Sequence, residues 1–339
     1  MPPLPGVWGC HPAPLHFPLL PTGEGGQGDE GKMIVDIHAH LMGPEVPGRA
    51  FWDGFTRLAV VQSGRTAERV RQRLADIWDL TGEQLLRDMD EAGVDKVMIM
   101  PVDWGLVPAF RDGTMDIWQQ HQLHADVARR HPDRIITFAC FDPRRPNASA
   151  LLERAVTELG MVGLKVHPAA GFFPNDRIVY PMYRKALELG IPVMVHTGPE
   201  PKPLYSRHCQ PVYVDDVAAD FPDLTIILAH AGLSAWWQEA AGVASVAPNV
   251  YLDISGWQAM ARLRPKEFYI ILRSLIDTVG PRRIMWGSDY PALRLLLSEA
   301  AWVEALTDPP EVAQNCGISF KPEEISAIMG DNAARLLGL

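Results

Sequence analysis

Residues 33–40 read MIVDIHAH, a short apolar run that ends in two histidines spaced two positions apart. Side chains alternate along a strand, so this run predicts Asp36, His38 and His40 on one face and the intervening apolar residues on the other. Two imidazoles that leave one strand end together can grip a single cation, since histidine is a common ligand of zinc and its neighbours. A single His-x-His motif also arises by chance from composition, so its value as evidence depends on the rest of the chain.

Later apolar runs also end in residues that carry ligand atoms. The runs 191–197, 224–231 and 283–290 contribute His196, His230 and Asp289. The run 162–168, VGLKVHP, places Lys165 and His167 on one face. One histidine at a strand end is more often structural than a ligand, but the same placement on strand after strand favours a shared metal or catalytic site.

The bulk composition is that of a globular enzyme. The chain has 339 residues, is 47% hydrophobic and carries a formal net charge of −10, which allows a full core and argues against nucleic acid or an anionic membrane as the main partner. No apolar run approaches the roughly 18 residues that span a bilayer. We expect a small-molecule substrate as the partner. The sequence leaves the assembly state open, with a homodimer as the working expectation.

The cysteines and the first residues bear on compartment and boundaries. The four cysteines show no CxxC or framework spacing and suit a reducing cytoplasm. Residues 1–32 are rich in Pro and Gly, without periodicity and without the basic start and apolar stretch of a signal peptide. We expect them to be a disordered or non-native extension, and residues 33–339 to be the folded domain.

From residue 33 onward the pattern alternates between strand and helix. Strands are expected at 33–38, 95–101, 134–141, 162–167, 191–196, 224–230, 250–255 and 283–288. Helical spacing of apolar residues fills the intervals, and Gly93, Gly160 and Gly190 are typical helix stops. This order predicts a (β/α)₈ TIM barrel with its site at the carboxyl ends of the strands. A doubly wound sheet is the alternative, but it should carry a Gly-rich phosphate turn, which is missing here.

Aromatic and basic residues follow several of these strands and are candidate substrate contacts. They are Trp104, His167, Arg207 and Trp257. The aromatic side chains could form an apolar pocket, and Arg207 could hold a substrate carboxylate. Ordinary packing or surface positions are the alternative for each of them. The long connections 41–80 and 198–213 are expected to form lids or pocket walls.

In order along the chain, the motifs DIHAH, GLKVHP, VMVHTG, ILAHAG, WGSDYP and NAARLLGL resemble those of the amidohydrolase superfamily. More narrowly they resemble its amidohydrolase-2 branch, which includes aminocarboxymuconate-semialdehyde decarboxylase, from Met33 to Leu339. The resemblance implies a TIM barrel with one or two divalent metals at its mouth. It implies as ligands His38, His40, His196 and Asp289, with His230 beside them.

Three imidazoles and a carboxylate suit Zn²⁺, with Mn²⁺, Fe²⁺ or Co²⁺ as alternatives. Such an ion lowers the pKa of a bound water from 15.7 to about 7. His230 is expected to shuttle a proton, and Asp289 could both bind the metal and accept the proton of the attacking water. One ion is favoured over two, because the branch member that the motifs resemble works with one.

Lys165 has two interpretations that stay open. Binuclear amidohydrolases place a carboxylated lysine at this strand, which would bridge two metals with His230 completing the second site. Alternatively Lys165 stays an ammonium in the barrel interior and pairs with a carboxylate such as Asp36 or Asp253.

The leading functional prediction is a metal-dependent hydrolase that acts on a small, carboxylated, cyclic or aromatic substrate through a metal-activated water. The alternative is a non-oxidative decarboxylase, a lyase that uses the same site. Relatives that resemble aromatic-acid decarboxylases often begin with Glu-x-His, whereas this chain has His38-x-His40, which favours hydrolysis. The branch member named above keeps His-x-His, so decarboxylation stays open as the alternative. A barrel that has lost catalysis and only binds is disfavoured, because none of the expected ligands is missing.

Overall fold

Parallel strands form the centre of the computed structural model, which describes residues 33–339 except 45, 111–114, 310–312 and 314–316. One sheet has the order β1 (Val35–Ala39), β2 (Lys96–Ile99) and β3 (Ile135–Thr137). The other has the order β4 (Ala139–Cys140), β5 (Leu164–Val166), β6 (Val193–His196), β7 (Ile226–Ala229), β8 (Val250–Asp253) and β9 (Ile284–Met285). These strands fall within or overlap the predicted runs. The extension predicted at 1–32 lies outside the described residues, so it and the domain boundary stay predictions.

The two sheets join at both edges, through the chain itself at one edge and through hydrogen bonds at the other. Only Phe138 separates β3 from β4, so the two continue one strand. At the other edge the Ile37 N–H donates to the Trp286 carbonyl over 3.2 Å, and Ala39 forms a parallel bridge with Tyr290. All the paired strands are parallel. The described strands therefore fit the eight-stranded (β/α)₈ barrel, and the predicted fold class is confirmed.

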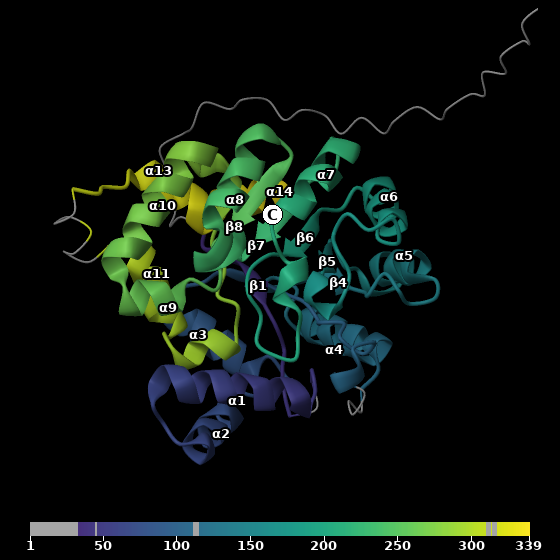
Figure 1. The fold of residues 1–339 in the computed structure, drawn as a ribbon, viewed down its shortest axis with the longest axis horizontal. Helices are drawn as coiled ribbons and strands as arrows, with labels where there is room; N and C mark the ends of the chain where they lie inside the picture. Colours follow the sequence, from purple (N-terminus) through teal and green to yellow (C-terminus); the bar gives the residue numbers. More distant parts are fainter. Residues whose placement is uncertain (1–32, 45, 111–114, 310–312, 314–316) are drawn as a thin grey trace, which may run out of the picture. The chain divides into compact units, whose positions relative to one another are not determined.

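Helices surround the strands in Figure 1. They are α1 (Arg49–Ser63), α2 (Ala67–Ala75), α3 (Glu83–Ala92), α4 (Ile117–Arg130), α5 (Ala148–Leu159), α6 (Tyr180–Glu188), α7 (Val212–Asp220), α8 (Leu233–Val246), α9 (Gln258–Leu263), α10 (Pro265–Val279), α11 (Glu299–Thr307), α13 (Pro322–Ser326) and α14 (Asn332–Leu337). Gly93 and Gly160 end α3 and α5 in the left-handed conformation, with φ of 69° and 73°. Glycine adopts this conformation without the strain that a Cβ causes, which is why both stops could be predicted.

Alternation along the strands divides the buried side chains between two apolar clusters. On β2, Val97 and Ile99 join the larger cluster with the helices, while Met98 joins a smaller one that includes Met194 of β6. Met194 touches Lys165, so the smaller cluster borders the polar site directly. The strands thus place apolar residues below the site and ligand-type residues at their carboxyl ends.

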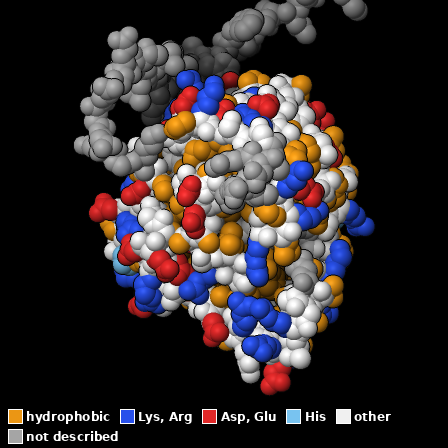
Figure 2. Space-filling view, turned by 90° about the vertical axis from the view of Figure 1, so that its left-hand side faces the viewer, with side chains coloured by type: hydrophobic (Ala, Val, Ile, Leu, Met, Phe, Trp, Pro, Cys, Tyr) orange, Lys and Arg blue, Asp and Glu red, His pale blue; other side chains and the backbone are white. Residues whose placement is uncertain are grey.

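The long connection after β1 is helical, and the surface carries charges of both signs. The long connection after β1 contains α1 and α2, and its role as a lid or pocket wall stays a prediction. The face shown in Figure 2 mixes basic and acidic side chains with apolar ones. Among the helices of the described part of the chain, none combines the length and apolarity needed to cross a bilayer.

Candidate metal centre

The two histidines of the first motif lie side by side at the end of β1, and both are buried. The Nδ1 atom of His38 is 2.6 Å from the Asp253 carboxylate, and the Nδ1 of His40 is 2.8 Å from the Met100 carbonyl. An Nδ1–H that donates to an acceptor leaves Nε2 unprotonated, and an unprotonated nitrogen is what binds a metal. The strand therefore delivers two unprotonated Nε2 atoms to the barrel mouth, and that of His38 lies 3.0 Å from the Lys165 Nζ.

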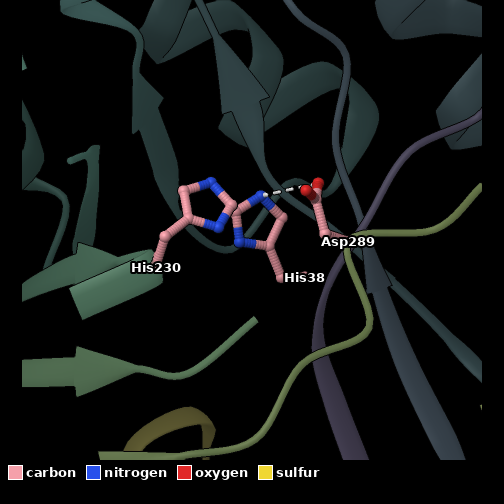
Figure 3. Close-up of side chains that lie close together, drawn as sticks. All are labelled: His38, His230 and Asp289. Atoms are coloured by element: carbon pink, nitrogen blue, oxygen red, sulfur yellow. Dashed lines mark ion pairs between the residues drawn. The ribbon is translucent and has the colours of Figure 1, made fainter. Parts of the chain in front are cut away.

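His230 and Asp289 reach the same place from the ends of β7 and β9. One donor atom each from His38, His230 and Asp289 lie within 4.8 Å of one another. Figure 3 shows the two imidazoles side by side and the carboxylate facing the His38 ring. The Asp289 Oδ1 atom is 3.9 Å from the Nε2 of His38 and 3.5 Å from the Nε2 of His40. We call His38, His40, His230 and Asp289 the central group.

The backbone is strained at two of these residues. His230 and Asp289 have φ of 63° and 52°, values that side chains with a Cβ rarely adopt. Such a conformation costs about 1–3 kcal/mol and persists only where the surroundings enforce it. Here the Asp289 N–H donates to the His38 carbonyl over 2.7 Å. Gly287 allows the close approach, because a Cβ there would lie 2.8 Å from the Cβ of His38.

Lys165 is fully buried on β5 and points to the central group. Its Nζ lies 3.0 Å from the Nε2 of His38. Burial lowers its pKa to about 8, and the nearby Asp253 opposes this shift. Among the described residues no carboxylate forms an ion pair with it, because Asp253 bonds His38 and Ser255 instead. The expected pair with Asp36 or Asp253 is therefore not formed, and the question of a carbamate stays open.

A second donor group follows β5 and β6. The Glu200 Oε1 atom lies 3.1 Å from the Nε2 of His196 and 3.3 Å from the Nε2 of His167. One donor atom from each of the three residues lies within 4.8 Å of the others. The His196 ring is also 4.7 Å from the ring of His230, so the two groups adjoin. That His196 shares one ion with His38, His40 and Asp289 stays a prediction, since its nearest carboxylate here is Glu200.

Burial sets the protonation of both groups. It lowers the pKa of His230, and lowers the pKa of His38, His167 and His196 well below the usual value, so these rings are neutral near pH 7. Burial raises the pKa of Glu200 to about 8. Burial also opposes ionisation of Asp289, but its hydrogen bond with His40 and the nearby imidazoles outweigh it and lower the pKa of Asp289.

Three polar residues of the site were not assigned by the sequence. Asp253 was considered only as a partner of Lys165, and Ser255 and Glu200 were not considered. Asp253 and Ser255 lie two apart at the end of β8, where alternation puts them on one face, so the pattern could have revealed them. Glu200 follows His196 by four residues in a loop, where no periodicity predicts the direction of a side chain.

The predicted substrate contacts have different surroundings. Trp104 is buried with its ring 5.1 Å from that of His167. Trp257 is buried and its Nε1–H donates to the His230 carbonyl over 2.9 Å, so it supports that residue from behind. Arg207 is exposed, and its guanidinium stacks on a neighbouring tyrosine. Contact of these residues with a substrate stays a prediction.

A cavity of about 460 Å³ lies away from both donor groups. It is lined by residues such as Met33, Phe320 and Met329, at the amino end of β1. The donor groups lie at the carboxyl ends of the strands, so their chemistry, and not this cavity, identifies the candidate site.

Sequence comparison finds one family and several relatives. The family model described as Amidohydrolase matches residues 35–339. The chain is 31% identical over 199 residues to 2-keto-4-carboxy-3-hexenedioate hydratase of Sphingobium sp. (strain NBRC 103272 / SYK-6), which covers 50% of this chain and 57% of that protein. It is 32% identical over 131 residues to L-fucono-1,5-lactonase of Burkholderia ambifaria, covering 34% and 42%. The chain thus spans about half the length of these curated relatives.

Solved structures share the fold at low identity. A 5-carboxyvanillate decarboxylase from Novosphingobium aromaticivorans with bound manganese superposes with a TM-score of 0.66 at 18% identity, covering 92% of this chain and 99% of that one. An amidohydrolase from Burkholderia multivorans with bound zinc superposes with a TM-score of 0.60 at 18% identity, covering 91% and 99%. At this identity the likeness establishes the barrel alone.

Proposed function

This chain belongs to the amidohydrolase family, and from this premise we propose that it is a metal-dependent hydrolase of a small, carboxylated, cyclic or aromatic substrate. The observation that carries the proposal is the shared arrangement of the three histidines in the central group. Each holds its Nδ1 against a protein acceptor or hydroxyl: Asp253, Met100 and Ser255. The Nε2 atoms of His38 and His40 then face the carboxylate of Asp289, which gives a donor set for a divalent cation, and the Nε2 of His230 is left for proton transfer.

Zn²⁺ is the ion that we propose, with Mn²⁺, Fe²⁺ or Co²⁺ as substitutes, because imidazole with one carboxylate suits all four. Solved neighbours contain zinc or manganese. The bound ion would polarise a carbonyl and lower the pKa of water. We propose that the central group holds one ion, and that Lys165 stays an ammonium and is not carboxylated. The Lys165 ammonium and the ion are then alternative partners for the Nε2 of His38.

His230 is the residue that we propose for proton transfer. Its Nδ1 faces the hydroxyl of Ser255 at 2.9 Å, and Trp257 fixes its backbone carbonyl. Burial lowers its pKa, so the ring is neutral and can accept a proton at pH 7. Asp289 has a lowered pKa and stays ionised, as a ligand or as a second acceptor requires.

Replacement of His230 by Ala tests this assignment. We expect kcat to fall by about 10²–10⁴-fold, which is the usual contribution of a positioned acid or base. Metal content measured on the same sample separates proton transfer, where the ion is retained, from ligation, where it is lost. His131→Ala, at the partly exposed C-terminal end of α4, is the control. Near-normal turnover in His230→Ala would contradict both roles.

Decarboxylation by the same residues is the alternative. The central group could hold a substrate carboxylate through the ion, with His230 as the acid that protonates the carbon left behind. Turnover in H₂¹⁸O distinguishes the two, using a panel of lactones, amides and aromatic carboxylates. Label in the product without release of CO₂ supports hydrolysis, and release of CO₂ without label supports the lyase.

We further propose a small molecule as the only partner needed for turnover, a homodimer as the assembly, and the cytoplasm as the compartment. The acidic net charge of −10 disfavours nucleic acid and anionic membranes as partners. Cys140 and Cys209 are buried free thiols, which suits a reducing compartment. Size-exclusion chromatography with light scattering measures the assembly.

A further inference from the structure

We propose that Arg144, Arg207 and His208 bind an anionic oxygen group, a carboxylate or a phosphate, in the connections that follow β4 and β6. Arg144 comes after β4, and Arg207 and His208 lie in η3 (Ser206–His208), between β6 and α7. We call these three residues the rim group. None of them belongs to the central group or to the donor group that contains Glu200. The site does not depend on a metal ion.

The guanidinium of Arg144 is held in one orientation by a buried carboxylate. Its Nε and Nη2 atoms donate to the Asp142 carboxylate over 2.9 and 2.5 Å, and Nη2 also donates to the Ala170 carbonyl over 3.0 Å. The side chain of Asp142 is fully buried, whereas that of Arg144 is 31% exposed. A planar guanidinium fixed in this way presents its remaining N–H groups in one direction, so little freedom is lost when an anion binds.

The Nη1 atom of Arg144 is the group that is left for a ligand. It makes no hydrogen bond within the described part of the chain. A Cβ built on Gly171 would lie 3.3 Å from this Nη1, and the nearest other described atom would be the Cδ2 of Tyr205 at 3.9 Å. Gly171 has φ of 120°, a conformation that disfavours any side chain. The missing side chain therefore leaves a gap beside the Nη1 N–H groups.

His208 carries a buried donor that lacks an acceptor. The Arg207 Nε–H donates to the Nε2 of His208 over 3.2 Å, so Nε2 is unprotonated. Burial lowers the pKa of His208, and the charges of Arg207 and Arg144 lower it further, so the ring is neutral near pH 7 with its proton on Nδ1. Among the residues that the structure describes, this Nδ1 has no hydrogen-bond partner, and His208 is only 5% exposed. A ligand oxygen would supply the acceptor.

The ring of Tyr205 connects the members of the rim group. Its Cδ2 borders the gap at Gly171, beside Arg144. The same ring lies 5.5 Å from the guanidinium carbon of Arg207 and 5.9 Å from the ring of His208. Tyr205 is 44% exposed, so the gap can be reached from solvent. The donors of the rim group therefore surround one accessible place.

The side chains of the rim group offer donors, which selects an anion as the ligand. A guanidinium stays protonated and has no acceptor, and the Nε2 of His208 is already in use. Of the acidic residues nearby, Asp142 is paired and Asp176 accepts the Phe173 N–H over 2.7 Å. Carboxylate and phosphate oxygens match the N–H groups of a guanidinium, and charge-assisted bonds of this kind are the stronger ones.

Two sources of such a group are compatible with this chemistry. One is a carboxylate of the substrate remote from the reacting bond, and this version rests on the proposed function. The other is a free anion that binds beside the substrate and does not react. The hydrogen bonds are the same in both, so binding is measured first and its link to turnover second.

Anion titration of the full chain tests the site. Inorganic phosphate and succinate are the probes, followed by calorimetry at constant ionic strength with zinc-loaded and with chelator-treated protein. We expect binding in both, because the rim group needs no metal. Arg144→Lys should weaken it by about tenfold or more, since an ammonium is a point charge without the planar fork. Arg154→Lys, on α5, removes an exposed bidentate pair with Glu158 and is the matched control.

His208→Phe is the second variant, and it keeps the ring while removing the Nδ1–H donor. It should also weaken both probes by about tenfold, and its melting temperature should not fall, because a buried donor without an acceptor is removed. If Arg144→Lys does not fold in a thermal melt, His208→Phe decides the matter. Chelator-treated protein that binds neither probe would overturn the proposal. Binding that the folded variants leave unchanged would overturn it as well.

Turnover identifies the source of the anion. If it belongs to the substrate, Arg144→Lys should raise KM about tenfold for a carboxylated substrate at nearly constant kcat and leave the neutral ester unaffected, and phosphate should compete. If it is a free anion, phosphate should bind without raising KM. A protein that turns over none of the substrates tested would count against the proposed function, and the calorimetric result would stand by itself.

Discussion

His38 illustrates how a single ring acquires its role from its neighbours. The Nδ1 atom lies 2.6 Å from the Asp253 carboxylate and 3.0 Å from the hydroxyl of Ser255, and the Nε2 faces Lys165. A buried imidazole without hydrogen-bond partners could carry its proton on either Nδ1 or Nε2. The acceptor at Nδ1 removes that freedom, because a buried carboxylate without a donor is far more costly than one with it. Asp253 therefore prepares His38 as a ligand without touching the ion itself.

Asp253→Asn tests this role at the residue scale. The amide turns one acceptor oxygen into a donor, so either the His38 ring or the Ser255 N–H loses its acceptor. We expect the affinity of the central group for its divalent ion to fall by about 10–100-fold, as measured by competition with a chelator of known affinity. Asp277→Asn, on the exposed face of α10, is the control. Unchanged affinity in Asp253→Asn would mean that the tautomer of His38 is set by another contact.

Among the elements, α4 carries a buried histidine with a structural role. His121 donates from Nδ1 to the Ile117 carbonyl over 2.7 Å, and its Nε2 accepts the Cys140 N–H over 2.9 Å. Burial lowers its pKa to about 3. The pKa in the unfolded chain is about 6.5, so the unfolded state takes up the proton first as the pH falls. The stability that the neutral ring provides is therefore complete above pH 6.5 and is lost progressively towards pH 3.

His121→Gln should flatten the fall of stability with acidity. Between pH 6.5 and 4 the wild type should lose up to about 1.4 kcal/mol per pH unit more than the variant, which is the contribution of one proton. Urea unfolding at several pH values measures both slopes. His131→Gln, at the end of the same helix, should keep the wild-type slope. Equal slopes in wild type and His121→Gln would show that this ring does not control acid stability.

Two helical glycines make a second contrast at the scale of elements. A Cβ on Gly330, in the π-helical turn η7 (Ala327–Asp331), would lie 1.8 Å from the carbonyl oxygen of Met33, just before β1. A Cβ on Gly242 in α8 would meet nothing within 4 Å. We expect Gly330→Ala to lower the free energy of unfolding by about 1–3 kcal/mol or more, since backbone must move. Gly242→Ala should raise it by about 0.5–1 kcal/mol in the same urea titration. If the two changes had the same sign, this packing of the terminal helices on β1 would be wrong.

At the scale of the whole molecule, the expected extension can be tested by removal. A protein that begins at Met33 should match the full chain in melting temperature and in turnover, because residues 1–32 show no periodicity that would pack on the barrel. Differential scanning calorimetry and an activity assay on both proteins compare them. A clear fall in either quantity would mean that residues before Met33 contribute to the fold or to the site.

The ring of strands is what assembles the site from distant parts of the chain. The Ser288 N–H donates to Asp36, 252 residues away, over 2.9 Å, and the Asp289 N–H donates to the His38 carbonyl. These bonds form only when the end of β9 lies beside β1. The amidohydrolase resemblance and the barrel class are confirmed. Both could be predicted because the order of the motifs and the alternation of strands and helices can be read from one sequence.

The sequence periodicity alone determines the positions of the strands and helices and the side of a strand on which each side chain lies. A period of two puts His38 and His40 on one side of the chain at the end of β1, and Lys165 and His167 on one side at the end of β5. Helix stops at Gly93 and Gly160 follow in the same way from backbone sterics. These properties depend on neighbours within a few residues, and so they can be predicted.

Only the tertiary structure decided which of these residues meet. It brought His38, His230 and Asp289 into one group, and it paired His196 with Glu200 from a loop whose path has no local signal. It also decided that Asp253 bonds His38 while Lys165 is left without a carboxylate. The physical reason is that distance between strand ends depends on the closure of the ring and on the burial of each connection. Neither is a property of the residues taken a few at a time.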